Sequence, residues 1–131
     1  MGLKLSLKPG ERIAINGAVL TNGDRRCSFV VENRARLLRE SDIMQPEDAT
    51  TPASRIYLPV MMMYLDPEQR HSCHAEFADR LTEFLDVVSD LDCKATCLTI
   101  AAQVANEDYY KALCNCRELM AYEKERLSNV A

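Results

Sequence analysis

The 131-residue chain lacks the compact motifs that mark common enzyme classes. It has no glycine-rich phosphate loop, no G-x-G-x-x-G fingerprint and no G-x-S-x-G nucleophile turn. Its only histidines, His71 and His74, flank Cys73. A Cys–His nucleophile–base pair is conceivable here, but adjacent residues on a helix do not face each other, which favours exposed helix residues without a catalytic role. We therefore expect a protein that is not an enzyme.

Long apolar stretches are also missing. No run approaches the roughly 18 residues of a membrane-spanning helix, and the longest one, Ile56 to Leu65, contains a proline. The N-terminus alternates polar and apolar residues and shows no signal-peptide cleavage site. We expect a cytoplasmic protein with no membrane partner, in which the six cysteines are reduced thiols.

The cysteine spacings do not suit a zinc site. Cys93 and Cys97 are four residues apart and Cys114 and Cys116 are two apart, so neither pair forms the C-x-x-C knuckle that zinc favours. Cys27, Cys97 and Cys116 are expected to be small core residues. We expect neither a metal nor a cofactor.

Charge is unevenly distributed along the chain. Residues 1–45 carry eight basic and five acidic side chains, a net charge of +3, and the remainder carries eight basic and fifteen acidic ones, a net charge of −7. A basic N-terminal third in an acidic protein favours an anionic partner for that third.

Residues 1–38 alternate polar and apolar positions, as short strands joined by tight turns do. Leu3, Leu5 and Leu7 alternate with polar neighbours, Pro9-Gly10 predicts a type II turn, and Asn16-Gly17 predicts a tight hairpin. The predicted strands are residues 3–8, 13–15, 18–20, 27–31 and 34–38. Five strands this short cannot close a core alone, so they must pack on helices or on a second copy of themselves.

Beyond residue 51 the apolar residues recur with helical spacing. Thr51-Pro52 and Asp66-Pro67 are helix-start signals, and Pro59 lies inside the first helix. Apolar residues at helical spacing predict three further helices. The second helix is marked by Phe77, Leu81, Phe84, Leu85 and Val88, and the third by Leu91, Ala95, Leu98, Ala102 and Ala105. The fourth is marked by Tyr109, Leu113, Cys116, Met120 and Leu127, with Asn106 as its cap.

The fold class is therefore α+β. A small antiparallel β module spans residues 1–45, and a bundle of three to four helices spans residues 46–131. A polar linker, residues 47–51, lies near the boundary.

Several separated blocks, in order, resemble the FlbT family. The opening LKLSLKPGE at residues 3–11 is similar to the start of these proteins, as are INGA at residues 15–18 and NGDRR at residues 22–26. Further matching blocks are LRESDIM at 38–44, TPA at 51–53, RIY at 55–57, MYLDP at 63–67, YYKAL at 109–113, Cys116-Arg117 and Tyr122-Glu123. The resemblance runs from residue 2 to about residue 124.

This resemblance implies a post-transcriptional role in flagellum biogenesis. FlbT proteins associate with the 5′ untranslated region of flagellin messenger RNA and promote its degradation, although some members support flagellin production. They work alongside the small protein FlaF. The implied partner is the flagellin messenger leader.

The N-terminal module also resembles, more weakly, the RNA-binding regulator CsrA. That family is a five-stranded dimer with interleaved strands, in which the first strand and an arginine of the last strand contact RNA. Arg39, followed by Glu40, matches that arginine, and Lys8 lies where a basic residue is expected. The chain departs from the pattern at Leu7, where that family usually has a second arginine.

The RNA-binding candidates are basic residues of the β module, namely Lys4, Lys8, Arg25, Arg26, Arg36 and Arg39. Such side chains neutralise phosphates, and the planar fork of Arg39 suits a base edge or a bidentate phosphate contact. Phe29 is the only aromatic residue of the module, so a base-stacking platform is not expected.

A rival interpretation places the function in the helices. In it, the protein controls flagellin synthesis or export by binding flagellin or FlaF and not RNA, through an apolar groove near Pro59 and Met61–Met63. The helices could equally mediate homo-oligomer formation.

Overall fold

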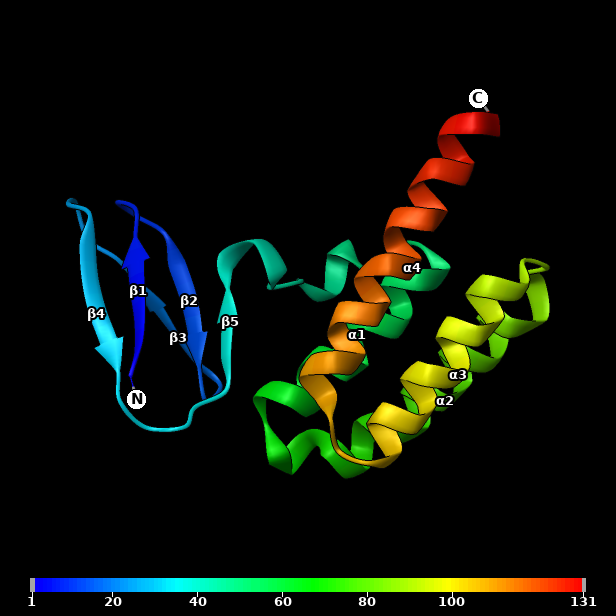
Figure 1. The fold of residues 1–131 in the computed structure, drawn as a ribbon, viewed down its shortest axis with the longest axis horizontal. Helices are drawn as coiled ribbons and strands as arrows, with labels where there is room; N and C mark the ends of the chain where they lie inside the picture. Colours follow the sequence, from blue (N-terminus) through cyan, green and yellow to red (C-terminus); the bar gives the residue numbers. More distant parts are fainter. Residues whose placement is uncertain (1, 131) are drawn as a thin grey trace. The chain divides into compact units, whose positions relative to one another are not determined.

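The chain forms two compact units, Met1–Ile43 and Met44–Ala131, in an α+β arrangement (Figure 1). A computed structural model describes residues 2–130, and it describes side chains up to residue 126. In the described residues of the first unit, the regular elements are strands and one short 3-10 turn, and the second unit contains the helices. The α+β class predicted from the sequence is confirmed.

The first unit has five antiparallel strands in two sheets. The strands are β1 (Leu3–Leu7), β2 (Arg12–Ile15), β3 (Ala18–Thr21), β4 (Cys27–Val31) and β5 (Leu37–Arg39). β1 pairs with β4, and β2 lies between β3 and β5. The last strand begins at Leu37 and not at Arg34 as predicted, so Arg36 lies outside the strand and Arg39 inside it.

Both predicted turns are confirmed by their backbone angles. Gly10 has a φ of +72°, and the N–H of Glu11 donates to the carbonyl of Lys8 at 3.0 Å. Asn16 and Gly17 have φ of +52° and +88°. Only glycine and asparagine adopt such angles at little cost.

The alternation along β1 sorts its side chains between a core and a solvent face. Leu5, Leu7 and Ile13 form the centre of the core. The partly buried residues packed against them are Ile15, Cys27, Phe29, Val31 and Leu37. Lys4 and Ser6 lie on the opposite, exposed face of β1.

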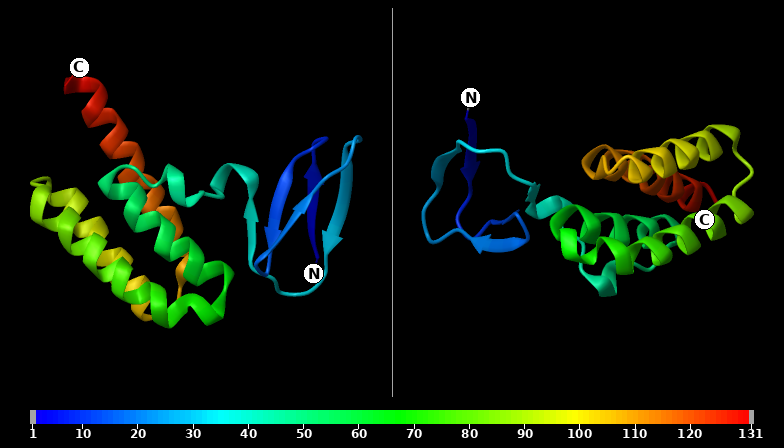
Figure 2. Two further views of the ribbon diagram at one scale, coloured as in Figure 1. Left: turned by 180° about the vertical axis from the view of Figure 1, so that it is seen from behind. Right: turned by 90° about the horizontal axis from the view of Figure 1, so that it is seen from below.

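The second unit has four helices, α1 (Pro52–Leu65), α2 (Arg70–Val87), α3 (Leu91–Ala105) and α4 (Tyr109–Val130). Short 3-10 turns at Pro46–Asp48 and Pro67–Gln69 precede α1 and α2. α1 packs on α2 and α4, and α3 packs mainly on α4. Figure 2 shows the α3–α4 pair, in yellow to red, facing the green α1–α2 pair.

The helix-start signals are confirmed. The hydroxyl of Thr51 accepts from the N–H of Ser54 at 3.2 Å, and the carboxylate of Asp66 accepts from the N–H of Glu68 at 3.0 Å. Both satisfy backbone donors that have no partner within the helix. α1 continues through Pro59.

The third helix exists, but the apolar stripe that marks it in the sequence is its exposed face. Leu91 and Leu98 are 79% and 65% exposed, and Ala95, Ala102 and Ala105 are exposed too. The buried residues of α3 are Cys93, Cys97, Ile100 and Val104. Both faces of this helix are apolar, so the spacing of apolar residues does not identify the buried one.

Asn106 does not cap α4 as predicted; it ends α3. Its N–H donates to the carbonyl of Ala102 at 3.0 Å, and Glu107 follows with a φ of +59°. α4 starts three residues later, at Tyr109. Its buried stripe includes Tyr109, Leu113 and Cys116 as predicted, whereas the side chain of Leu127 lies outside the described residues.

Candidate nucleic-acid interface

The end of β1 is held by a network centred on Asn22. Its side-chain amide donates to the carbonyls of Leu7, Lys8 and Arg25 at 3.2, 2.8 and 2.9 Å. Its side-chain oxygen accepts from the N–H of Gly23 at 2.9 Å. One asparagine thus joins the end of β1 to the loop that leads into β4.

Arg39 reaches this same place from β5. It pairs with Ile13 across the sheet, so its side chain starts on the core side. Its Nη2 donates to the carbonyl of Ser6 at 2.9 Å and lies 3.4 Å from Oε2 of Glu11. The side chain of Arg39 remains 43% exposed. Arg39 therefore connects the two sheets while presenting part of its guanidinium to solvent.

Arg26 approaches the same residue of β1 from the β4 side. Its Nη1 lies 3.5 Å from the hydroxyl of Ser6. Lys8 and Arg25 are exposed, and their carbonyls are both held by Asn22. We call the four cations Lys8, Arg25, Arg26 and Arg39 the basic corner.

Of the six predicted RNA-binding residues, the structure groups four in the basic corner. Lys4 lies on the same exposed face as Ser6, two residues earlier, which is about 7 Å along the strand. Arg36 lies apart: its carbonyl and N–H bond to Asn16 at the β2–β3 turn, at 2.8 and 2.9 Å. The role of all six in RNA binding stays a prediction.

The sequence indicated the cations of the corner but not the residues that position them. The Asn22-Gly23 pair predicts only a turn, and no sequence pattern marks Glu11 or Ser6 as positioning residues. Their hydrogen bonds join segments far apart in the chain, such as Ser6 to Arg39. An N-G pair predicts a turn, but nothing local shows that the asparagine amide also bonds to another strand.

The acidic residue Glu11 contacts two members of the corner, Lys8 and Arg39. The N–H of Lys8 donates to its Oε1 at 2.9 Å. This hydrogen bond, helped by the adjacent Arg39 and opposed by partial desolvation, holds the pKa of Glu11 below its ordinary 4.5. The carboxylate thus stays ionised and keeps Arg39 in place.

The Glu11 contacts predict an acid-sensitive component of stability. Because the folded pKa is lower than the unfolded one, the contribution is present above the unfolded pKa and is lost as pH falls through the folded pKa. We expect the urea midpoint of the first unit to fall between about pH 6 and about pH 3 by more in the wild type than in Glu11→Gln. Equal pH profiles for the two proteins would contradict this prediction.

The second unit has a hollow where the rival interpretation placed one. It lies beside Pro59 and Met62, extends to Cys73 and Arg80, and has a volume of about 320 Å³. Met61 and Met63 are buried and do not line it. Among the described residues no cluster of histidine, cysteine or acidic side chains could hold a metal ion, and no described helix is long and apolar enough to cross a membrane.

These observations define a small two-unit α+β protein with a basic corner on its β unit and an apolar hollow on its helical unit. Comparison with known proteins gives its family. Residues 3–127 match the family described as "Flagellar protein FlbT". The chain belongs to the FlbT family.

Three relatives show how closely the chain follows the family. A Caulobacter species has a protein named "Probable flagellum biosynthesis repressor protein FlbT", 53% identical over 131 residues and covering 100% of both chains. The "Flagellum biosynthesis repressor protein FlbT" of Caulobacter vibrioides is 53% identical, covering 100% of this chain and 93% of the relative. A "Probable flagellum biosynthesis repressor protein FlbT 1" of Bradyrhizobium diazoefficiens is 36% identical, covering 95% of this chain and 84% of the relative. No solved structure matches the chain.

Proposed function

We propose that this protein regulates flagellum synthesis after transcription, by binding the 5′ untranslated region of flagellin messenger RNA through its β unit and promoting degradation of the messenger. Relatives that share its full length are named flagellum biosynthesis repressors, which supports a regulatory role. The RNA-binding step is the part of the proposal that rests on the β unit.

The observation that carries this proposal is the basic corner. The side chains of Arg26 and Arg39 reach Ser6, and Asn22 bonds the backbone carbonyls of Lys8 and Arg25. Three segments thus bring basic residues to the end of β1, in a unit with a net charge of +3. The helical unit, by contrast, has a net charge of −7. Polyanions bind where cations are held close together, because each phosphate contact releases a counterion.

Recruitment of a nuclease explains messenger decay better than catalysis by this chain. The first unit contains no histidine, and the carboxylate of Glu11 is engaged by Lys8 and Arg39. A general base must be able to accept a proton from its substrate, and Glu11 is not placed for that. The protein would therefore mark the messenger for a separate enzyme.

Gel-shift binding to a flagellin messenger leader across a salt series tests the proposal. Arg39→Ala should weaken binding by on the order of tenfold, and the lost phosphate contact should make the salt slope shallower by about 0.7. Arg34→Ala, which removes an exposed charge outside the corner, should change affinity much less.

A second variant separates charge from structure, because Arg39 also connects the two sheets. The double variant Lys8→Ala/Arg25→Ala removes two charges whose side chains make none of the hydrogen bonds of the Asn22 network. It should fold normally and bind more weakly, with a shallower salt slope. Failure of the folded wild type to bind the leader at low salt would refute the RNA mechanism.

The hollow beside Pro59 and Met62 supports the alternative, a protein partner such as flagellin or FlaF. Met62 offers a flexible thioether at its rim, and such side chains adapt to varied apolar surfaces. Retention of regulatory function by a variant that has lost RNA binding would favour this alternative.

A further inference from the structure

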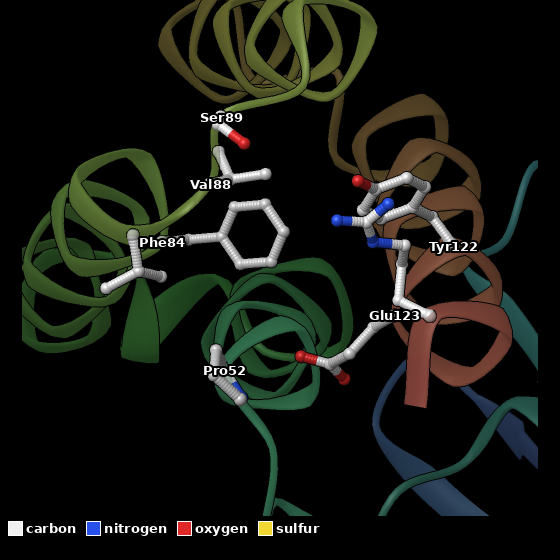
Figure 3. A pocket seen from close by; sticks show the side chains of 8 residues that line it. Pro52, Phe84, Val88, Ser89, Tyr122 and Glu123 are labelled. Carbon is white, nitrogen blue, oxygen red and sulfur yellow. The ribbon is translucent and has the colours of Figure 1, made fainter. Parts of the chain in front are cut away.

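A second hollow in the helical unit lies where α2 ends, α1 begins and α4 passes (Figure 3). Its volume is about 350 Å³, near the lower end of the range of roughly 300–1,000 Å³ seen for small-ligand sites. None of the residues that line it takes part in the basic corner or lines the hollow beside Pro59.

One side of this hollow is apolar. Phe84 is 4% exposed and, with Val88, forms a wall in Figure 3. Val87 at the end of α2 also lines the hollow, and this apolar residue is 75% exposed. Covering such surface releases about 25 cal/mol for each Å² removed from water, so an apolar side chain is favoured here.

The other side carries charge, and most of that charge is already engaged. Oε2 of Glu123 accepts from the N–H of Ala53 at 3.0 Å, at the positive end of α1. The nearby Asp90 accepts from the N–H of Cys93 at 3.0 Å and caps α3. Each carboxylate thus has one oxygen engaged by a backbone N–H at a helix start, and among the described residues neither forms an ion pair with Arg126.

Arg126 is the exception. It is exposed and lines the hollow, and its guanidinium lies 5.7 Å from the centre of the Tyr122 ring. Among the described residues it forms no ion pair. The ring face orients the guanidinium without neutralising it. The guanidinium of Arg126 thus keeps free N–H donors for an anionic group, and it lines the same hollow as the apolar wall.

We propose that this hollow receives the C-terminal residue of a protein partner, with its apolar side chain against Phe84 and Val87 and its α-carboxylate on Arg126. The hydroxyl of Ser89, directed into the hollow in Figure 3, supplies a further donor. A C-terminal apolar residue is the only place in a polypeptide where an apolar side chain and a carboxylate belong to one residue. The small volume and the single available cation favour that compact arrangement.

Fluorescence anisotropy with the full chain and matched peptides tests this proposal. The probe is a fluorescein-labelled peptide, Gly-Ser-Gly-Ser-Leu-Leu, with a free C-terminal carboxylate. One comparison peptide ends in an amide, and another places Leu-Glu internally and also ends in an amide. We expect the free acid to bind on the order of tenfold more tightly than either, because a charge-assisted hydrogen bond is worth roughly that ratio.

Protein variants assign the effect to Arg126. In Arg126→Gln, the acid and the amide should bind equally, because the cation that distinguishes them is gone. Lys94→Gln removes a positive charge from α3, outside the hollow, and should leave the preference for the acid unchanged. Both residues are on helix surfaces, and circular dichroism checks that both variants fold.

Three outcomes would overturn the proposal. Equal binding of the acid and the amide to the wild type would remove the role of the carboxylate. A preference that survives in Arg126→Gln would place the carboxylate elsewhere. Binding of the internal Leu-Glu peptide as tightly as the free acid would replace a C-terminal ligand with an acidic segment. RNA binding by Arg126→Gln should be unchanged, so the two proposals fail independently.

Discussion

Replacing Ile100 by alanine is expected to lower the free energy of unfolding of the helical unit by roughly 2–5 kcal/mol. Ile100 is 0% exposed on the face of α3 that packs on α4. Truncation removes buried methyl groups and leaves a cavity that the neighbours fill only in part. Leu98, two residues earlier, is 65% exposed, and its replacement by alanine should change stability by no more than roughly 0.5 kcal/mol.

Urea unfolding followed by circular dichroism measures both changes. Comparing the two variants is a strict test, because the sequence alone predicts the opposite order of stability losses. The apolar stripe predicted to be buried includes Leu98 and does not include Ile100. A loss for Leu98→Ala as large as that for Ile100→Ala would contradict the orientation of α3.

Replacing Asn22 by alanine is expected to lower the stability of the β unit by roughly 1–3 kcal/mol and to weaken RNA binding as well. The change removes the amide that serves three carbonyls, those of Leu7, Lys8 and Arg25. The carbonyl of Leu7 is the most shielded of the three, because it belongs to a residue that is only 4% exposed. Without Asn22 the loop before β4 loses its side-chain hydrogen bonds to the end of β1, so Arg25 and Arg26 are held less firmly in the basic corner.

Two further variants make the Asn22 prediction sharper. Asn22→Asp keeps the oxygen that accepts from Gly23 but places a second oxygen against three carbonyls, so it should be at least as destabilising. Asn33→Ala changes an exposed asparagine in another loop and should cost roughly 0.5 kcal/mol or less. An Asn22→Ala protein with wild-type stability and wild-type RNA affinity would show that the network does not organise the corner.

The candidate site was predictable in composition but not in arrangement. The sequence shows the basic side chains, and the net charge of +3 over residues 1–45 indicates that this segment has an anionic partner. Their grouping was not visible, because Arg39 and Ser6 are 33 residues apart in the chain and meet only when the two sheets pack. Arg36 illustrates the same point: it is three residues from Arg39, yet it bonds to Asn16 at another turn.

The sequence by itself determined the local features of this protein. Gly10 and Asn16-Gly17 form turns because their backbones adopt positive φ at little cost, and Thr51 and Asp66 start helical segments because their side chains satisfy free backbone donors. These effects act within a few residues, so short patterns reveal them.

Tertiary structure alone decided which face of α3 is buried. One apolar face of this helix consists of Cys93, Cys97, Ile100 and Val104. The opposite face carries the exposed apolar residues Leu91, Ala95, Leu98, Ala102 and Ala105. Apolar periodicity identifies a buried face only when the opposite face is polar. With both faces apolar, burial depends on where the neighbouring helix α4 lies, and that is a property of the packed bundle.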